Sequence, residues 1–207
     1  MLRSSKLGPV IVKAMKSRHF EAYYCDDKEK ALQLALSLIP PDHTVSWGGS
    51  ATIAKIGLIQ QVKEKYKVID RDSAETKEQK DNLMRQALLA DTYLTGANAI
   101  SEDGQLVNVD GIGNRVAAMI YGPRNVIVVA GMNKVEKTVE DALVRARTIA
   151  APINAQRFPG LETPCLITGS CGNCKSTDSI CSYISIIRLC RPAGKIKVIL
   201  VGDELGY

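Results

Sequence analysis

Apolar and polar positions follow two different periods along this chain, and these periods predict its helices and strands. Residues 8–20 and 27–39 space their apolar side chains as amphipathic helices do, and Pro40 and Pro41 end the second helix. Short apolar runs rich in β-branched residues predict five strands, at residues 44–47, 67–71, 91–96, 125–131 and 196–201. Helical spacing between these runs predicts four more helices. The first is capped by Ser50 or Thr52, and the second, over 73–90, is capped by Ser73. The other two cover 113–122 and 135–152, and Pro152 ends the last one.

Strands that alternate with helices are typical of an α/β fold, because parallel strands need a crossover between them. We therefore expect a three-layer structure in which helices flank a mostly parallel sheet. The 207 residues are 45% hydrophobic and 24% charged, which suits one globular domain. Within that domain we distinguish N-terminal helices in residues 1–40 and a cysteine-rich excursion at residues 160–190.

The stretch from Asp91 to Gly131 is more polar than a connection between two strands requires. Asp103 and Gly104 stand between two short alternating runs, which is a strong hairpin signal. Hairpin and capping duties account for these two residues and in part for Asn114. The polar side chains that still need a ligand are Asn98, Glu102, Asp110 and Arg115. We therefore expect this stretch to form the floor of a site.

A second candidate site follows the strand at residues 44–47. Gly48 and Gly49 form a tight turn, and Ser50 then begins a helix. Free backbone N–H groups at such a turn bind anions, because glycine allows a ligand to approach closely. The alternative is a simple turn between a strand and a helix, and the sequence leaves both interpretations open.

Five of the six cysteines lie within residues 165–190. In a reducing compartment, such clustering indicates a metal site or redox chemistry more than structural disulfides. The candidate ligands for a zinc ion or an iron-sulfur cluster are Cys165, Cys171, Cys174 and Cys181. A redox dithiol and reduced structural cysteines remain alternatives. Thr177 or Asp178 is the expected cap of a helix that contains Cys181. The other two cysteines are expected to be packing residues: Cys25 lies near a helix start, and Cys190 lies at the end of an apolar helix.

Charge and hydropathy exclude several classes of protein. The net charge is +5, but the basic residues are interleaved with acidic ones, and only two Phe and one Trp are present to stack on bases. We therefore expect no nucleic-acid partner. No apolar run reaches the roughly 18 residues that a membrane span needs, and the first residues lack the apolar core of a signal peptide. This predicts no membrane partner and a cytoplasmic location.

Several motifs in a fixed order resemble the lactate utilisation (LUD) domain family, in the branch with a C-terminal cysteine motif. The resemblance runs from about Val45 to the C-terminus. The motifs are WGGSATIAKIGL, LTGANAISEDGQLVNVDGIGNRVAAMIYGPRNVIVVAGMNKV, APINAQRF, TPCLITGSCGNCKSTDSIC and KVILVGDELG. The resemblance implies a fold similar to CoA transferases and sugar-phosphate isomerases. It also implies a link to the oxidation of lactate to pyruvate, beside iron-sulfur partners.

The resemblance also implies where a ligand binds. In that fold, loops at strand ends hold phosphate, CoA or a small acid, and Gly48, Gly49 and Ser50 match one such loop. A second donor-rich loop contains Gly113, Asn114 and Arg115, whose guanidinium is expected to pair a carboxylate or phosphate bidentately.

The string from Ser101 to Gly104 is similar to the Ser-Glu-Asn-Gly motif of CoA transferases, which makes Glu102 a candidate nucleophile. Asp103 departs from that motif. The alternative is that Asp103 and Gly104 form the hairpin turn while Glu102 is exposed.

The sequence leaves three functions open. The first is a protein of lactate or organic-acid utilisation that binds a small anionic metabolite and carries an iron-sulfur cluster or zinc. The second is an acyl-CoA or sugar-phosphate enzyme that uses Glu102. The third is a non-catalytic subunit or regulator of an iron-sulfur or flavin oxidoreductase. Whether the chain is an enzyme, and whether it forms a homo-oligomer, stays open in all three.

Overall fold

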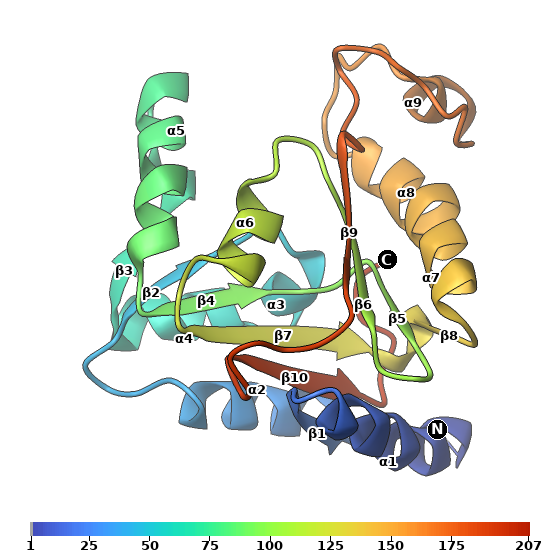
Figure 1. Ribbon diagram of the computed structural model, residues 1–207. Helices are drawn as coiled ribbons and strands as arrows, with labels where there is room; N and C mark the ends of the chain where they lie inside the picture. The colour runs from blue at the N-terminus through green and yellow to red at the C-terminus, as the bar shows by residue number, and fades with distance from the viewer. Residues whose placement is uncertain (1) are drawn as a thin grey trace.

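A six-stranded sheet forms the middle layer of the protein in the computed structural model, which describes residues 2–207 (Figure 1). Its strand order is β1-β10-β7-β4-β2-β3, and every neighbouring pair is parallel. The strands are β1 (Glu21–Cys25), β2 (Thr44–Trp47), β3 (Lys67–Ile69), β4 (Thr92–Thr95), β7 (Asn125–Gly131) and β10 (Ile196–Val201). The α/β class with helices on a parallel sheet is therefore confirmed.

Nine α-helices are present in the described part of the chain, and those that cover the sheet lie on both of its faces (Figure 1). Helices α2, α3 and α4 pack on one face, while α1, α6 and a second sheet cover the other. Their bounds are α1 (Leu2–Ser17), α2 (Lys28–Ser37), α3 (Ala51–Lys55), α4 (Leu58–Lys65), α5 (Lys77–Gln86), α6 (Asn114–Ile120), α7 (Val139–Arg145), α8 (Ala151–Ala155) and α9 (Pro164–Thr168).

Strand β7 shows why the apolar runs of this chain are continuous. All seven of its residues are buried, with Val126 and Val128 in one core cluster and Ile127 and Val129 in the other. A parallel strand covered on both faces has no solvent side, so both sets of alternating positions are apolar.

A smaller four-stranded sheet stands against the first, in the order β8-β5-β6-β9. Strands β5 (Ala99–Ser101) and β6 (Leu106–Asp110) pair antiparallel and form the predicted hairpin, with Gly104 at φ +88 in its turn. Strands β8 (Val135–Glu136) and β9 (Tyr183–Ile187) complete the sheet. This hairpin carries the polar stretch from the end of β4 to the start of α6.

Strand β1 was not predicted, because it lies directly between two helices in the segment assigned to N-terminal helices. It pairs with β10, about 175 residues further along the chain, so its partner is not visible locally. Cys25 ends this strand, and α2 begins shortly after it at Lys28, so Cys25 lies near a helix start as expected. Its burial confirms a packing role.

Several predicted helices have different bounds in the structure. The first, expected over residues 8–20, is α1 (Leu2–Ser17) and ends before His19, whose φ is +65. The helix after Ser50 is divided into α3 and α4 at Gly57, whose φ is +76. Helix α5 begins after Thr76, which caps it by accepting a hydrogen bond from the backbone N–H of Gln79, so Ser73 is not the cap. Pro152 does not end the last helix. The chain passes through a π-helical segment (Ala146–Ala150) and places Pro152 in the first turn of α8, where its missing N–H is no loss.

The cysteine-rich segment also differs from its predicted secondary structure. Residues 171–182 contain no helix, and Asp178 accepts a hydrogen bond from the backbone N–H of Glu162 instead of capping one. The apolar run before Cys190 is the strand β9, paired antiparallel with β6, and not a helix. Periodicity cannot separate a helix from a strand in so short a run. Cys190 is 1% exposed and is a packing residue, as expected.

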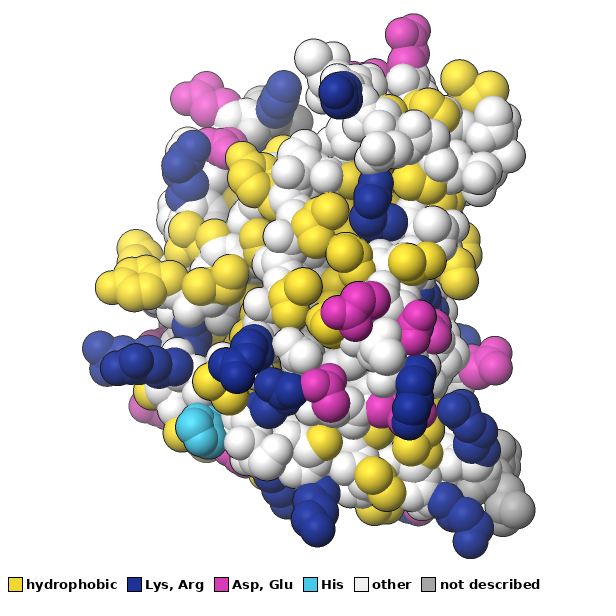
Figure 2. All heavy atoms as spheres, turned by 45° about the vertical axis from the view of Figure 1, so that its right-hand side comes forward, with side chains coloured by type: hydrophobic (Ala, Val, Ile, Leu, Met, Phe, Trp, Pro, Cys, Tyr) yellow, Lys and Arg dark blue, Asp and Glu magenta, His cyan; other side chains and the backbone are white. Residues whose placement is uncertain are grey.

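No helix in residues 2–207 combines the length and the apolar character needed to cross a bilayer. Figure 2 shows hydrophobic side chains gathered over the face that brings β9, α7 and α8 forward. Large apolar side chains exposed on these elements are Val144, Ile153, Tyr183, Ile184 and Ile186.

The hairpin turn gives a test of this packing. An ideal Cβ on Gly104 would lie 2.7 Å from the backbone N and 2.9 Å from the Cα of Met15, in helix α1. We expect Gly104→Ala to lower the free energy of unfolding by about 1–2 kcal/mol for its left-handed backbone and by about 1–3 kcal/mol more for the clash. Urea unfolding measures this loss.

Gly57→Ala is the matched control, since Gly57 also has a positive φ but a Cβ there meets nothing within 4 Å. The free energy of unfolding of Gly57→Ala should fall only by the part that comes from the left-handed backbone. Equal losses at the two positions would show that the hairpin does not pack against α1 as described.

Candidate functional site

A large cleft opens over the carboxyl ends of the parallel strands, where ligands bind in open α/β sheets. Its volume is about 1120 Å³. It is lined by residues that follow β2, β4 and β6, by α5, and by residues at α8 and the C-terminus. Helices α5 and α8 stand on opposite sides of α6 in Figure 1. The fold thus brings together segments that are more than 150 residues apart.

Most of the predicted ligand-binding residues line this cleft: Gly49, Ser50, Asn98, Asp110, Gly113, Asn114 and Arg115. Gly48 lies beneath them. An ideal Cβ at Gly48 would be 2.9 Å from the Tyr93 hydroxyl and 3.1 Å from Arg115 Cδ, so no larger residue fits there. Ser50 begins α3 as predicted, and its Oγ accepts a hydrogen bond of 3.4 Å from the N–H of Ile53.

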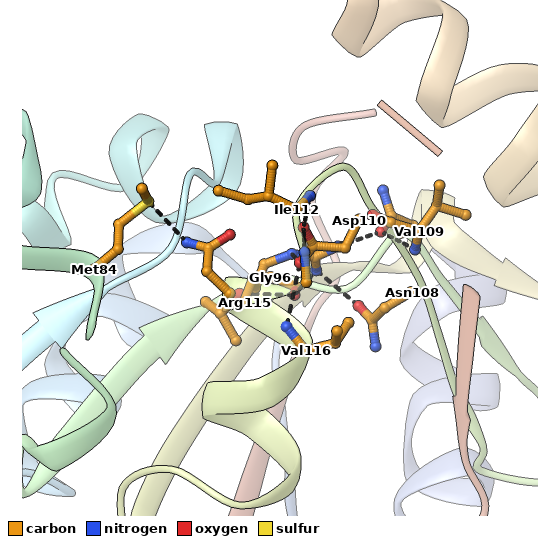
Figure 3. A network of polar contacts seen from close by, with 12 residues as sticks. Met84, Gly96, Asn108, Val109, Asp110, Ile112, Arg115 and Val116 are labelled. Atoms are coloured by element: carbon orange, nitrogen blue, oxygen red, sulfur yellow. Dashed lines mark hydrogen bonds and ion pairs between the residues drawn. The ribbon is translucent and has the colours of Figure 1, made fainter. Parts of the chain in front are cut away.

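Arg115 organises the floor of the cleft (Figure 3). Its side chain is buried, and both of its Nη atoms donate to oxygens of the protein. Nη1 donates to Asn108 Oδ1 at 2.8 Å and to the Gly96 carbonyl at 3.2 Å. Nη2 donates to Asn98 Oδ1 and to the Val109 carbonyl, each at 2.7 Å. The bidentate anion contact expected of Arg115 is therefore taken by internal partners.

Asp110 also has an internal duty. Its Oδ1 accepts hydrogen bonds from the backbone N–H groups of Ile112 and Gly113, and its Oδ2 accepts one from Val116. Asp110 Oδ2 lies 3.7 Å from Arg115 Nε as well. The carboxylate thus shapes the loop that begins α6 and balances the buried guanidinium.

Arg71 was not recognised in the sequence, where it ends a predicted strand. It lies in a 3-10 turn after β3 (Arg71–Ser73) and lines the cleft. Its Nη2 lies 2.6 Å from the position of an ideal Cβ on Gly49, so the guanidinium rests against the glycine turn. Its Nε is buried with no hydrogen-bond partner within residues 2–207, and the carboxylate of Asp72 is 3.6 Å away. Its Nη1 donates to Met84 Sδ at 3.9 Å, so the buried donor without a hydrogen-bond partner is Nε.

Lys134 is the second cleft residue that sequence reasoning missed. It follows β7 in a 3-10 turn (Met132–Lys134) and is 4% exposed. Its Nζ donates to Thr52 Oγ1 at 3.0 Å and to the Ala97 carbonyl at 3.2 Å. Burial and the neighbouring charges of Arg145 and Arg115 lower the pKa of Lys134 to about 7. The sequence signal that could have identified Lys134 is a lysine shortly after β7, a strand whose residues are all buried.

Glu102 does not line the cleft. It follows β5 in the hairpin turn, at the opposite end of the hairpin from Asn98 and Asp110, where Lys137 Nζ lies 2.5 Å from its Oε2. The neighbouring Asp103 is held by α1, because Arg18 Nε donates to its carbonyl at 2.6 Å. Desolvation opposes ionisation of Asp103, but hydrogen bonds from Ser101 and Gln105 and the charge of Arg18 outweigh it and lower its pKa. These contacts fit the hairpin turn expected at Asp103 and Gly104, although the Glu102 side chain is only 20% exposed.

The four candidate metal ligands lie in one region of the structure, beside the cleft and not in it. Burial, together with the neighbouring thiols of Cys165, Cys171 and Cys174, raises the pKa of Cys181 to about 11. The segment reaches the cleft through Ile180, whose Cα lies 3.3 Å from an ideal Cβ on Gly111. Within residues 2–207, no three His, Cys, Asp or Glu side chains are arranged to hold a metal ion.

The Arg115 network predicts a stability effect. We expect Arg115→Met to lower the free energy of unfolding by about 3 kcal/mol or more, since it leaves buried acceptors and the Asp110 carboxylate unpaired. Urea unfolding is the measurement, with Arg71→Gln as a control that should lose about 1 kcal/mol or less, as substitutions outside buried networks do. An Arg115→Met variant of unchanged stability would contradict the structural role.

Comparison with known proteins gives a family but no established activity. No curated protein matches this chain. Among solved structures, a DUF162 family protein from Deinococcus radiodurans is similar over 96% of this chain and 98% of its own, with 13% identity and a TM-score of 0.54. This shows a shared fold.

Two ribose-5-phosphate isomerase structures are similar over about half of the chain. The ribose-5-phosphate isomerase A from Methanocaldococcus jannaschii has 18% identity and a TM-score of 0.35, covering 54% of this chain and 55% of its own. A D-ribose-5-phosphate isomerase in complex with phospho-erythronic acid has 19% identity and a TM-score of 0.34, covering 53% of each chain. The model of the LUD domain matches residues 9–201, and the chain therefore belongs to the LUD domain family.

Proposed function

We propose that this protein binds a small organic acid, of the size and charge of lactate or pyruvate, in the cleft above the parallel sheet. The family supports a role in lactate utilisation in general terms. The choice of ligand rests on the charges of the cleft and on the unused donor of one arginine.

The charge of the cleft favours an anion. Seven basic and three acidic side chains line it. Each acid is already close to a base: Asp110 to Arg115 at 3.7 Å, Asp72 to Arg71 at 3.6 Å, and Asp81 to Arg85 at 2.8 Å. The remaining basic residues, with no acidic partner in the described chain, are Lys77, Lys80, Lys134 and Arg157. A low-dielectric cleft with such a surplus concentrates anions.

The observation that carries the proposal is the state of Arg71. Its guanidinium faces the cleft beside Gly49, and no hydrogen bond within residues 2–207 uses its buried Nε. A buried donor without a partner is costly, and a ligand carboxylate would satisfy it with a charge-assisted hydrogen bond. The planar guanidinium suits a planar carboxylate better than a lysine ammonium does.

Arg71→Gln gives the direct test. We expect this substitution to weaken lactate or pyruvate binding by roughly 10- to 100-fold, the effect of losing a charged hydrogen bond worth about 1.5–3 kcal/mol. Isothermal titration calorimetry measures it, and lactamide, which replaces the carboxylate with a neutral amide, should not bind.

Arg124→Gln is the matched control, because Arg124 is exposed and lies outside the cleft. It should leave the affinity unchanged. Equal binding of lactate and lactamide, or an unchanged affinity in Arg71→Gln, would contradict the proposed contact.

We propose as a second property that the four clustered cysteines bind zinc or an iron-sulfur cluster. Thiolates suit both groups. The proximity of Cys181 to Cys165, Cys171 and Cys174 supports the donor set. The thiols do not yet converge in a ligating arrangement within the described chain, so the loops between them would have to close around the metal. No chemical step in the cleft is assigned to this metal.

Anaerobic purification tests the metal. We expect stoichiometric metal in the wild-type protein and its loss in the double variant Cys171→Ser/Cys174→Ser, because a site that keeps two of four thiolates binds far more weakly. Elemental analysis and the visible absorption spectrum together separate zinc from an iron-sulfur cluster.

Cys25→Ala is the control, since Cys25 is buried at the end of β1 and lies far from the cluster in sequence and fold. This variant should keep its metal. Folded wild-type protein that contains no metal after anaerobic purification would contradict the site.

A further inference from the structure

We propose that the amine of Lys134 is a nucleophile that forms an imine with the carbonyl carbon of a 2-oxo acid bound in the cleft. This inference rests on the proposed function, because it needs the cleft to hold the carboxylate of the same molecule. It adds a covalent step and selects oxo acids from the wider class of small organic acids.

The position of Lys134 is the first argument. Its Nζ lies where the carboxyl ends of four adjacent strands meet. Lys134 itself follows β7, its partner Ala97 follows β4, and its partner Thr52 follows β2 in α3. The fourth strand is β10. The segment after it lies close to the amine, since an ideal Cβ on Gly206 would lie 3.0 Å from Lys134 Nζ.

The hydrogen bonds of the amine are the second argument. A neutral amine has two N–H donors and one lone pair, whereas an ammonium has three donors. Lys134 Nζ has two acceptors within the described chain, Thr52 Oγ1 and the Ala97 carbonyl. Thr52 Oγ1 in turn donates to the Leu205 carbonyl at 3.3 Å, which directs its own lone pair toward the lysine. The surroundings therefore satisfy a neutral amine and leave its lone pair unused.

The charges around Lys134 are the third argument. No carboxylate forms an ion pair with it in residues 2–207, and the charged groups that act on it are Arg145 of α7 and Arg115 of α6. Both are cations, so they oppose protonation of the amine. Desolvation acts in the same direction, because burial disfavours the charged form of lysine. Together they lower the pKa of Lys134 to about 7, which makes a large fraction of the amine nucleophilic at neutral pH.

The chemical step is balanced without another reactant. The Nζ lone pair attacks the carbonyl carbon, a C–N bond forms, and the carbonyl oxygen takes up a proton. That proton comes from the amine, so the carbinolamine then loses the oxygen as water together with the second amine proton and leaves a C=N bond. The cations of the cleft hold the carboxylate of the oxo acid while the amine reacts.

The segment after β10 holds the amine in place. Asn133, next to Lys134, accepts a hydrogen bond from the Leu205 N–H at 3.1 Å and donates one to the Gly206 carbonyl at 3.3 Å. Lys55 Nζ donates to the Glu204 carbonyl at 3.0 Å. These contacts fix the backbone beside the Nζ atom, and the glycine leaves room that a side chain would fill.

Reductive trapping tests the proposal. The full-length protein is incubated with pyruvate and sodium cyanoborohydride, which reduces an imine to a stable secondary amine, and intact mass is measured. We expect one adduct per chain, which peptide mapping places on Lys134. The rate of trapping should rise with pH through about 7, as the Lys134 amine loses its proton. At pH 7 an ordinary lysine, with a pKa near 10.4, should react about a thousandfold more slowly.

Lys134→Met should reduce trapping to background, whereas Lys65→Met, which removes an exposed lysine outside the cleft, should retain it. Circular dichroism checks that both variants fold. If Lys134→Met does not fold, the position of the adduct mapped in the wild-type protein decides whether Lys134 is the reacting lysine. An adduct on other lysines, or trapping that persists in folded Lys134→Met, would overturn the inference.

Calorimetry with lactate, which has no carbonyl group to trap, keeps this test separate from that of the proposed function. Lactate and pyruvate that bind without any pyruvate adduct would overturn the imine and leave the binding site standing. Failure of both acids to bind would overturn both.

Discussion

The buried guanidinium of Arg115 is the interaction on which the site depends. It joins the turn after β4 to strand β6 through four hydrogen bonds, and thereby fixes the small sheet against the carboxyl ends of the large one. A guanidinium with that many internal partners is costly to bury and costly to disturb. Gly48 and Tyr93 pack directly beneath it, so the glycine turn after β2 takes its position from the same side chain.

Once Arg115 is in place, two further basic residues of the cleft acquire different properties from their surroundings. Arg71 keeps a buried Nε that no hydrogen bond in the described chain uses, 3.6 Å from Asp72, and we propose that it holds a carboxylate. Lys134 is enclosed by neutral acceptors and by other cations, which favours the uncharged amine. As proposed, Arg115 frames the cleft, Arg71 anchors a carboxylate and Lys134 supplies the amine. Position in the fold, and not residue type, distinguishes these roles.

The cysteine segment joins this arrangement from a distant part of the chain. Strand β9 pairs with β6, so the residues after Cys181 belong to the small sheet, and Ile180 and Tyr183 form part of the cleft wall. A change in the cysteine loops would therefore reach the cleft through contiguous packing, in particular through the contact of Ile180 with Gly111.

The sequence by itself determined the features that depend on local periodicity. The buried run of β7, the β5–β6 hairpin and the glycine turn after β2 were all visible, because alternation, turn chemistry and capping act over a few residues. Most of the ligand-binding residues that it predicted also line the cleft. Tertiary structure decided which of them have free donors. Arg115 and Arg71 look alike in sequence, but oxygens on β6 and on the turn after β4 satisfy Arg115, while the buried Nε of Arg71 has no hydrogen-bond partner in the described chain. The pairing of β1 with β10 and the pKa of Lys134 likewise arise from segments far apart in the chain, which no local pattern reports.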